Sequence, residues 1–248
     1  MQPSTLERLP LFMTLGNLGK PSADQFSRTR KLIMVPMIFA THSDSEFIEL
    51  LNQYWLEALK QVRNLESRLG SVSYVFHEGG VDDGEAGLIS LEKGSPEVFQ
   101  TIKEICSDGA VLCSLEDTEL LLETLDLQRC LMIAQASQVV QSQLREWFLS
   151  ARKRRYDSIA SRIDGMLSED QMAVLFIGQG HQVQFPGDLQ VFYVAPPSLD
   201  AIDRWVREND IPMSSTDVGA AEPDTSSGNS GNSGINGDPN GASGEHEE

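Results

Sequence analysis

The apolar residues of this chain follow two patterns that alternate along it. Short, continuous apolar runs recur five times, and polar or turn residues follow each run, as is typical of strands buried on both faces of a sheet. These runs lie at residues 31–40, 71–76, 110–115, 172–177 and 189–194. Between them, apolar residues recur at helical spacing. The alternation predicts a layered α/β fold with a mostly parallel or mixed sheet of about five strands flanked by helices.

The helical patterns differ in length. A long amphipathic helix is expected up to Gly70, with Ser43 or Asp44 as its N-cap, and two short helices are expected within 85–108. Residues 118–167 are helical almost throughout, so we expect a cover layer or a small subdomain there. We expect that block to consist of helices at about 119–127, 128–150 and 156–167, and a last helix at 199–209. Pro36 predicts that the first strand lies near an edge or a bulge, since proline donates no hydrogen bond.

The two ends of the chain differ in composition from its middle. Residues 1–29 are punctuated by proline and glycine, which predicts an irregular lead-in. Residues 214–248 contain seven acidic residues and seven glycines but no lysine or arginine. Such a segment has too little to bury, so we expect a disordered acidic tail. The remaining residues, 30–213, are expected to form a single α/β domain.

Charge and cysteine content narrow the classes of function. The net charge is −18, and residues 1–213 alone hold 30 acidic against 19 basic residues, a net −11. This surplus disfavours nucleic-acid binding. No apolar stretch is long enough for a membrane span and no secretory signal is present, so we expect a cytoplasmic protein without membrane contact. The three cysteines lack metal-binding spacing and are expected to be reduced. The sequence does not fix an oligomeric state.

Candidate chemistry gathers where the predicted strands end. Three histidines follow strand ends, and carboxylates occupy similar positions. Parallel strands bring their carboxyl ends to one edge, where open α/β sheets bind ligands. The expected metal ligands are His42, His77, Glu78 and His181. Imidazoles and carboxylates are ligands for a divalent metal ion of the hydrolytic kind. The alternative is that strand ends favour polar residues simply because the chain turns there.

Further residues receive roles on the same reasoning. Glu116 and Asp117 follow the third strand, where a spare carboxylate could act as general base. Gly178 and Gly180 allow the backbone to approach a ligand or cofactor closely, although a tight turn explains them as well. The basic run 152–155 is expected to be a solvated helix face, unless Arg154 or Arg155 turns inward to hold an anion.

The strand-end residues resemble a known group of proteins. The early strand ending in His42, the second ending in Glu78, the late helix beginning Arg155-Tyr-Asp, and the turn Gly178-Gln-Gly-His181 together resemble the erythromycin esterase, ChaN and TraB superfamily. The resemblance covers about residues 31–194. It implies an α/β fold with one pocket and activities that span hydrolysis, metal-dependent peptidase action and haem-iron binding. His42, Glu78, His181 and Arg155 are the matched positions; the first strand lacks the expected glycine lead before His42.

Two other resemblances are more distant. The segment 183–197 is similar to bacterial proteins of comparable length with no known activity. The alternation of strands and helices is also similar to proteins related to peptide-chain release factors. Peptidyl-tRNA hydrolysis by those proteins depends on a Gly-Gly-Gln tripeptide. This chain lacks the residue central to that activity, because Gly79-Gly80 is followed by Val81 instead of glutamine.

Two hypotheses of function follow. The first is a metal-dependent hydrolase, in which a bound divalent ion activates water and a carboxylate is the general base. The second is a non-catalytic module that binds a small molecule, a peptide or haem at the same edge, with the acidic tail as a solubiliser or tether.

Overall fold

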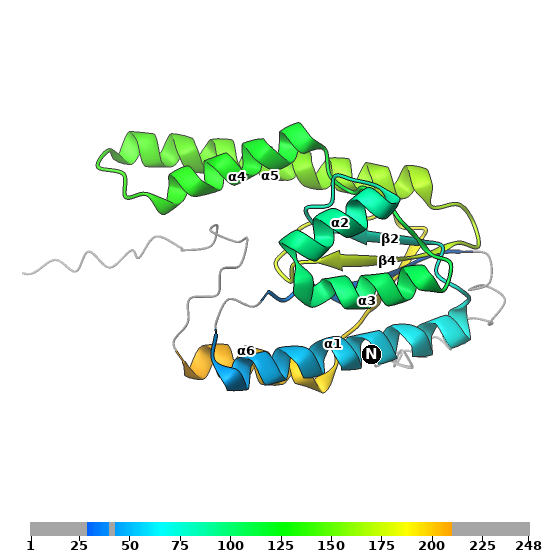
Figure 1. The fold of residues 1–248 in the computed structure, drawn as a ribbon. Helices are drawn as coiled ribbons and strands as arrows, with labels where there is room; N and C mark the ends of the chain where they lie inside the picture. The colour runs from blue at the N-terminus through cyan, green and yellow to red at the C-terminus, as the bar shows by residue number, and fades with distance from the viewer. Residues whose placement is uncertain (1–28, 40–42, 210–248) are drawn as a thin grey trace, which may run out of the picture.

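The computed structural model describes residues 29–39 and 43–209, and Figure 1 shows their arrangement. The predicted lead-in up to 28, His42 and the predicted acidic tail lie outside the described residues. Within them, five strands and six helices form an α/β fold, so the predicted fold class is confirmed. In chain order they are β1 (Arg30–Pro36), α1 (Ser45–Leu69), β2 (Tyr74–His77), α2 (Gly84–Gly94), α3 (Pro96–Ser107), β3 (Val111–Leu112), α4 (Thr118–Met132), α5 (Gln138–Met166), β4 (Met172–Ile177), β5 (Leu189–Tyr193) and α6 (Pro197–Glu208).

The sheet is parallel at every strand pairing, in the order β3-β2-β4-β1-β5. Two inner strands of the sheet, β1 and β4, are neighbours. Their pairing begins with Lys31 opposite Met172 and ends with Pro36 opposite Ile177. Both strands are buried on their two faces, which explains why their sequences are continuous apolar runs. Pro36 predicted a place near an edge or a bulge; β1 is next to the edge strand β5 but is itself paired on both sides, with β4 and β5. Proline is accommodated because it is the last residue of the strand, where Met37 takes up the next backbone bond to Ile177.

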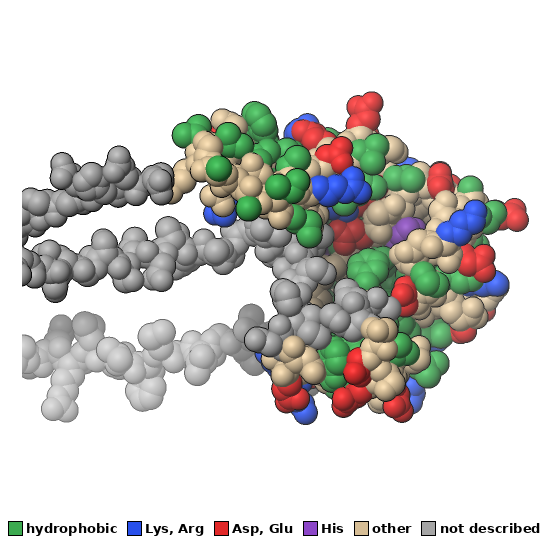
Figure 2. Space-filling view, turned by 60° about the vertical axis from the view of Figure 1, so that its left-hand side comes forward, with side chains coloured by type: hydrophobic (Ala, Val, Ile, Leu, Met, Phe, Trp, Pro, Cys, Tyr) green, Lys and Arg blue, Asp and Glu red, His purple; other side chains and the backbone are tan. Residues whose placement is uncertain are grey.

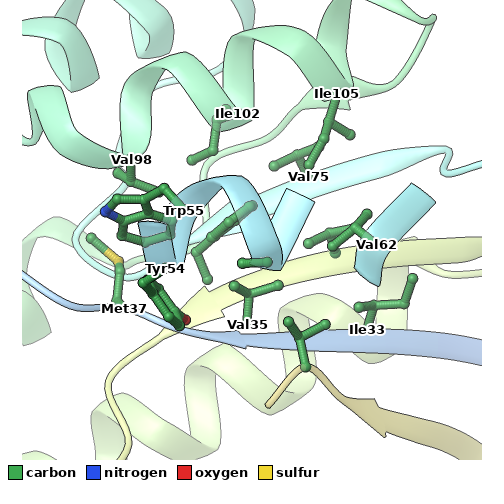
Figure 3. Packing of buried hydrophobic residues seen from close by; sticks show 14 of the residues in the cluster. Ile33, Val35, Met37, Tyr54, Trp55, Val62, Val75, Val98, Ile102 and Ile105 are labelled. Atoms are coloured by element: carbon green, nitrogen blue, oxygen red, sulfur yellow. The ribbon is translucent and has the colours of Figure 1, made fainter. Parts of the chain in front are cut away.

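Helices cover both faces of the sheet. On one face, α1, α2, α3 and α6 pack on alternate residues of the strands, such as Ile33 and Val35 of β1. Figure 3 shows Tyr54 and Trp55 of α1 on the side of Val35 and Met37, and Val62 of α1 beside Ile33. The other face packs against α5 and includes Leu32 and Met34. This alternation follows from the two-residue period of a strand. No helix in the described ranges combines the length and apolarity of a membrane span.

The helical block after β3 differs from its prediction. The expected breaks within 128–167 are wrong, because α5 runs unbroken from Gln138 to Met166 after Ser137 caps its first turn. The true break lies at 133–137, between α4 and α5. The third strand is also shorter than expected and contains Val111 and Leu112 only.

The two helices α4 and α5 form a hairpin, and α4 makes its packing contacts with α5. Figure 1 shows that the second half of α5 covers the sheet, whereas α4 and the first half of α5 extend beyond the carboxyl ends of the strands. The hairpin therefore overhangs the edge where the predicted chemistry gathers.

Candidate functional site

The carboxyl edge of the sheet contains a crevice. After β1 the chain continues into α1 on one face, whereas after β4 it enters a loop whose Val183 packs on the α5 face. Adjacent strands whose connections diverge in this way open a ligand-binding crevice between them. A pocket of about 220 Å³ lies there. It is lined by the ends of β1, β4 and β5, including Pro36, Gly178 and Tyr193, together with His181 and Leu199.

A buried ion cluster, formed by Arg155, Glu116 and Glu78, lies next to the crevice. The Arg155 guanidinium, from the covering half of α5, donates through both Nε and Nη2 to the two carboxylate oxygens of Glu116; the Nε contact is 2.9 Å. Its Nη2 also donates to Glu78 Oε1 at 3.0 Å. The side chains of Arg155 and Glu116 are 5% and 0% exposed, whereas that of Glu78 is 12% exposed. Two carboxylates thus face one guanidinium, and Glu78 is the one that reaches toward solvent.

Backbone N–H groups complete this cluster. Gly178, which lines the pocket, donates to Glu78 Oε2 at 2.8 Å, and Gly79 donates to Glu116 Oε1 at 3.2 Å. Each carboxylate oxygen has two acceptor positions. The contacts given above use one position on each oxygen of Glu78, so a second remains on each. Glu78 can therefore hold a further donor, such as a water molecule or a ligand hydroxyl group.

The geometry of the turn after β2 requires glycine at both positions, Gly79 and Gly80. Gly79 has a φ of +82°, a backbone conformation that favours glycine. Gly80 has no room for a side chain, because a Cβ atom would lie 2.7 Å from His77 Nε2. The Gly80 carbonyl accepts from the N–H groups of Leu115 and Glu116 at 2.8 and 2.9 Å. The turn thus fixes Glu116 against the end of β2.

His77 is buried beside this turn. Its Nδ1 atom lies 3.1 Å from the Glu78 carbonyl oxygen, and because a carbonyl only accepts, Nδ1 carries the proton. The lone pair of the ring is then on Nε2. Burial lowers the pKa of His77, and the contact with the Glu78 carbonyl and the charge of Glu116 offset part of that effect.

His181 has the opposite arrangement of protons. Its Nδ1 accepts the backbone N–H of Val183 at 3.3 Å, so in the neutral ring the proton is on Nε2. Burial lowers the pKa of His181, and the negative charge of Glu78 offsets part of this. His181 lines the pocket. It therefore offers the pocket an N–H donor, not a lone pair.

The basic run 152–155 is divided between two environments, which corrects the expected solvated face. Arg152 and Arg155 are buried, whereas Lys153 and Arg154 are exposed. Arg152 lies over the ring of Phe148. Lys153 and Arg154 pair on the surface with Asp157 and Glu123, each at 2.6 Å. The inward alternative, in which an arginine of this run holds an anion, applies to Arg155.

The remaining predicted site residues, Asp117 and Gly180, have structural contacts, and so does Asp44, which was predicted as an N-cap. Asp44 caps α1, and Asp117 caps α4 by accepting the Leu120 N–H at 3.0 Å. The Asp117 side chain is thus oriented by the helix, and its action as a general base stays a prediction. Gly180 lies in the turn that Gly178 and His181 close with a backbone hydrogen bond.

Among the described residues, the predicted metal ligands already have partners within the protein. Both Glu116 oxygens face Arg155, and both Glu78 oxygens accept hydrogen bonds. The protonated Nε2 of His181 has no lone pair to offer. Among the described residues no cluster of three potential ligands is found, and His42 lies outside them. The divalent-metal site therefore stays a prediction, and no chemical step below depends on it.

Sequence reasoning missed part of this site. The pocket wall from β5 and the partnership of Gly178 with Glu78 both depend on strand order, which the sequence does not reveal. The Gly79-Gly80 pair was a usable signal, since adjacent glycines after a strand often mark a required turn or a close approach.

Fold and site together define a parallel α/β protein with a crevice at the carboxyl edge of its sheet. Comparison of the chain with protein-family models, with curated proteins and with solved structures found no match in any of the three. The resemblance to the erythromycin esterase, ChaN and TraB superfamily stays a prediction.

Proposed function

We propose that this chain is a hydrolase that acts on a small, largely apolar ester or amide bound in the crevice. The observation that carries the proposal is the pairing of a histidine N–H donor with a carboxylate behind one pocket. His181 lines the pocket and offers Nε2–H, while Gly178 in the pocket wall is bonded to Glu78. Hydrolysis of a carbonyl compound needs a proton acceptor for water and a donor for the carbonyl oxygen, and we assign the first role to Glu78, which contacts the pocket through Gly178.

The roles follow from the geometry. Glu78 accepts a proton from water, and the resulting hydroxide attacks the carbonyl carbon of the substrate. His181 Nε2–H donates to the carbonyl oxygen as negative charge develops there. Glu78 then returns the proton to the leaving group. Arg155 and Glu116 are positioning residues, because they hold the Glu78 carboxylate without facing the pocket themselves.

The size of the pocket limits the substrate. Its volume of about 220 Å³ lies below the roughly 300–1,000 Å³ of sites for drug-sized ligands. A short acyl group fits this volume better than haem or a long peptide does.

A second candidate is a binding module for the same kind of molecule without turnover. It is favoured because both oxygens of Glu78 already accept hydrogen bonds. That arrangement suits holding a hydroxyl or amine group as well as activating water.

One experiment separates the two. The wild type is assayed against short and long acyl nitrophenyl esters, anilides and phosphate esters, beside Glu78→Gln and His181→Ala. Glu169→Gln, on an exposed turn, and Gln184→Ala, on the same loop as His181, are the controls. Turnover of short esters that falls by roughly 10²–10³-fold in the two site variants supports the hydrolase.

Binding provides the second readout. Calorimetry with butyrate and butyramide as probes is run on the same set of proteins. Binding lost in His181→Ala, without turnover of any substrate, supports the binding module and overturns the hydrolase. Equal activity in site and control variants overturns both assignments of the crevice.

A further inference from the structure

The hairpin of α4 and α5 has an apolar end that its own two helices leave uncovered. Large hydrophobic side chains at the turn and along the first half of α5 are well exposed: Met132 75%, Ile133 66%, Val139 78%, Val140 46% and Trp147 54%. Figure 2 shows hydrophobic side chains gathered on the upper helices of the molecule. We define these five residues as the hairpin tip. Exposed clusters of this kind mark interaction surfaces in proteins.

The hairpin tip is ordered by hydrogen bonds within the turn. The Gln135 amide donates to the carbonyl oxygens of Cys130 and Ile133 at 3.0 and 2.9 Å, which closes the turn between the helices. The Ser137 side chain accepts from the Val140 N–H and begins α5. The exposed Ile133 and Val140 therefore belong to an ordered stretch of backbone. A surface that is ordered before binding loses less conformational entropy when a partner covers it.

We propose that the hairpin tip is a self-association surface, and that two copies of this chain pack their hairpins together into a four-helix bundle. Two-fold pairing of like surfaces is the commonest form of oligomer, and antiparallel helix pairs are readily completed as four-helix bundles. On α5 the exposed Val140 and Trp147 lie, by helical spacing, next to the half-buried Leu144 and the buried Phe148, so the apolar surface of the tip is continuous with the contact between the helices.

Charge favours a second copy over other occupants. The chain carries a net charge of −18, but residues 130–144 contain no charged residue. Two acidic copies repel one another except through such a neutral segment. A basic partner is drawn to the acidic surfaces elsewhere instead, and an anionic membrane repels the chain as a whole.

The exposed apolar area of the tip approaches that of a dimer interface. If a fully open large side chain presents on the order of 150–200 Å², the exposed fractions of the five tip residues amount to roughly 500–600 Å² per copy. Neighbouring exposed residues at the turn, Cys130, Ala134 and Ala136, add to this. A standard interface buries about 800 Å² per partner. The tip therefore approaches that size, and we expect association in the micromolar range.

The test measures mass in solution for the full chain. Light scattering and sedimentation are run from about 1 to about 100 µM, the range in which a modest interface dissociates. We expect a mass twice the 27.4 kDa of one chain at the upper end. The double variant Met132→Glu, Val139→Glu is expected to raise the dissociation constant at least tenfold. The control is Leu56→Glu, at an equally exposed leucine of α1 (72%), which is expected to dimerise as the wild type does.

Hydrogen exchange locates the interface without any substitution. Amides of residues 130–147 are expected to exchange more slowly at high than at low concentration of the wild type. The proposal is overturned by a wild type that is monomeric throughout the range, by a dimer that survives the double variant, by loss of the dimer in Leu56→Glu, or by concentration-dependent protection confined to other segments.

Discussion

Glu116 provides a sharp test of the buried ion cluster. In Glu116→Gln the amide oxygen can keep the contacts of Oε1, but the amide nitrogen then faces Arg155 Nε–H, so two donors meet at a side chain with no exposure. Removing one partner of a buried ion pair costs about 3–5 kcal/mol when the remaining charge is left without compensation. Because Glu78 still pairs with Arg155, we expect the lower end, about 3 kcal/mol, which for a domain of this size corresponds to a fall in Tm of roughly 6–12 °C.

The matched control is Glu123→Gln. It removes the same charge, but from a pair with Arg154 in which both side chains are about half exposed; such pairs contribute at most about 1 kcal/mol. Thermal melting and urea unfolding, followed by circular dichroism, measure both variants. An unchanged urea m-value shows that the comparison concerns stability alone. If Glu116→Gln loses no more stability than Glu123→Gln, the cluster does not have the energetic role assigned to it.

Two further predictions concern the turn after β2. Gly80→Ala should lower the free energy of unfolding by about 1–3 kcal/mol, because the added Cβ atom meets the His77 ring at 2.7 Å. The control, Gly94→Ala in the open last turn of α2, should be neutral or slightly stabilising. Equal urea midpoints for the two variants would count against the close approach of Gly80 to His77. Burial lowers the pKa of His77 from its usual 6.5, so the unfolded chain binds the proton more readily than the folded chain does. The stability contributed by the neutral ring is therefore present above pH 6.5 and is lost as the pH falls through the folded-state pKa. His77→Gln should therefore show a smaller loss of urea midpoint than the wild type between about pH 7.5 and about pH 5.5, and an identical loss in both proteins contradicts this assignment.

Much of the fold could be predicted from the sequence because burial on two faces leaves a clear pattern. β4 is buried at all six positions, and its predicted limits, 172–177, match the structure. The limits of α1 follow from the Asp44 cap and from Gly70. The errors arise where contacts between distant parts of the chain determine the limits of an element. α5 remains one helix because half of it packs on the sheet, and β3 is short because only two of its residues pair regularly with β2.

The candidate site was less predictable. Glu78, Glu116 and Arg155 were each singled out, and the structure brings them together. Their mutual contacts were not foreseen, since an arginine in a basic run gives no sign of which residues face inward. Helical spacing explains the division afterwards: Arg152, Arg155 and Ile159 lie on one face of α5 and are all buried. The pocket wall from β5 depends on strand order, which no local pattern carries.

The unbroken course of α5 has a consequence for which changes of length the chain tolerates. Val139 at the hairpin tip and Arg155 in the ion cluster belong to one helix and are separated by about 24 Å along its axis. Each residue of a helix turns the chain by about 100°, so inserting one residue between them rotates the tip by that angle about the helix axis, relative to the sheet. Insertions of seven residues nearly restore the face and lengthen the overhang by about 10 Å. The distance of the tip from the crevice can therefore change only in such steps if its direction is to be kept.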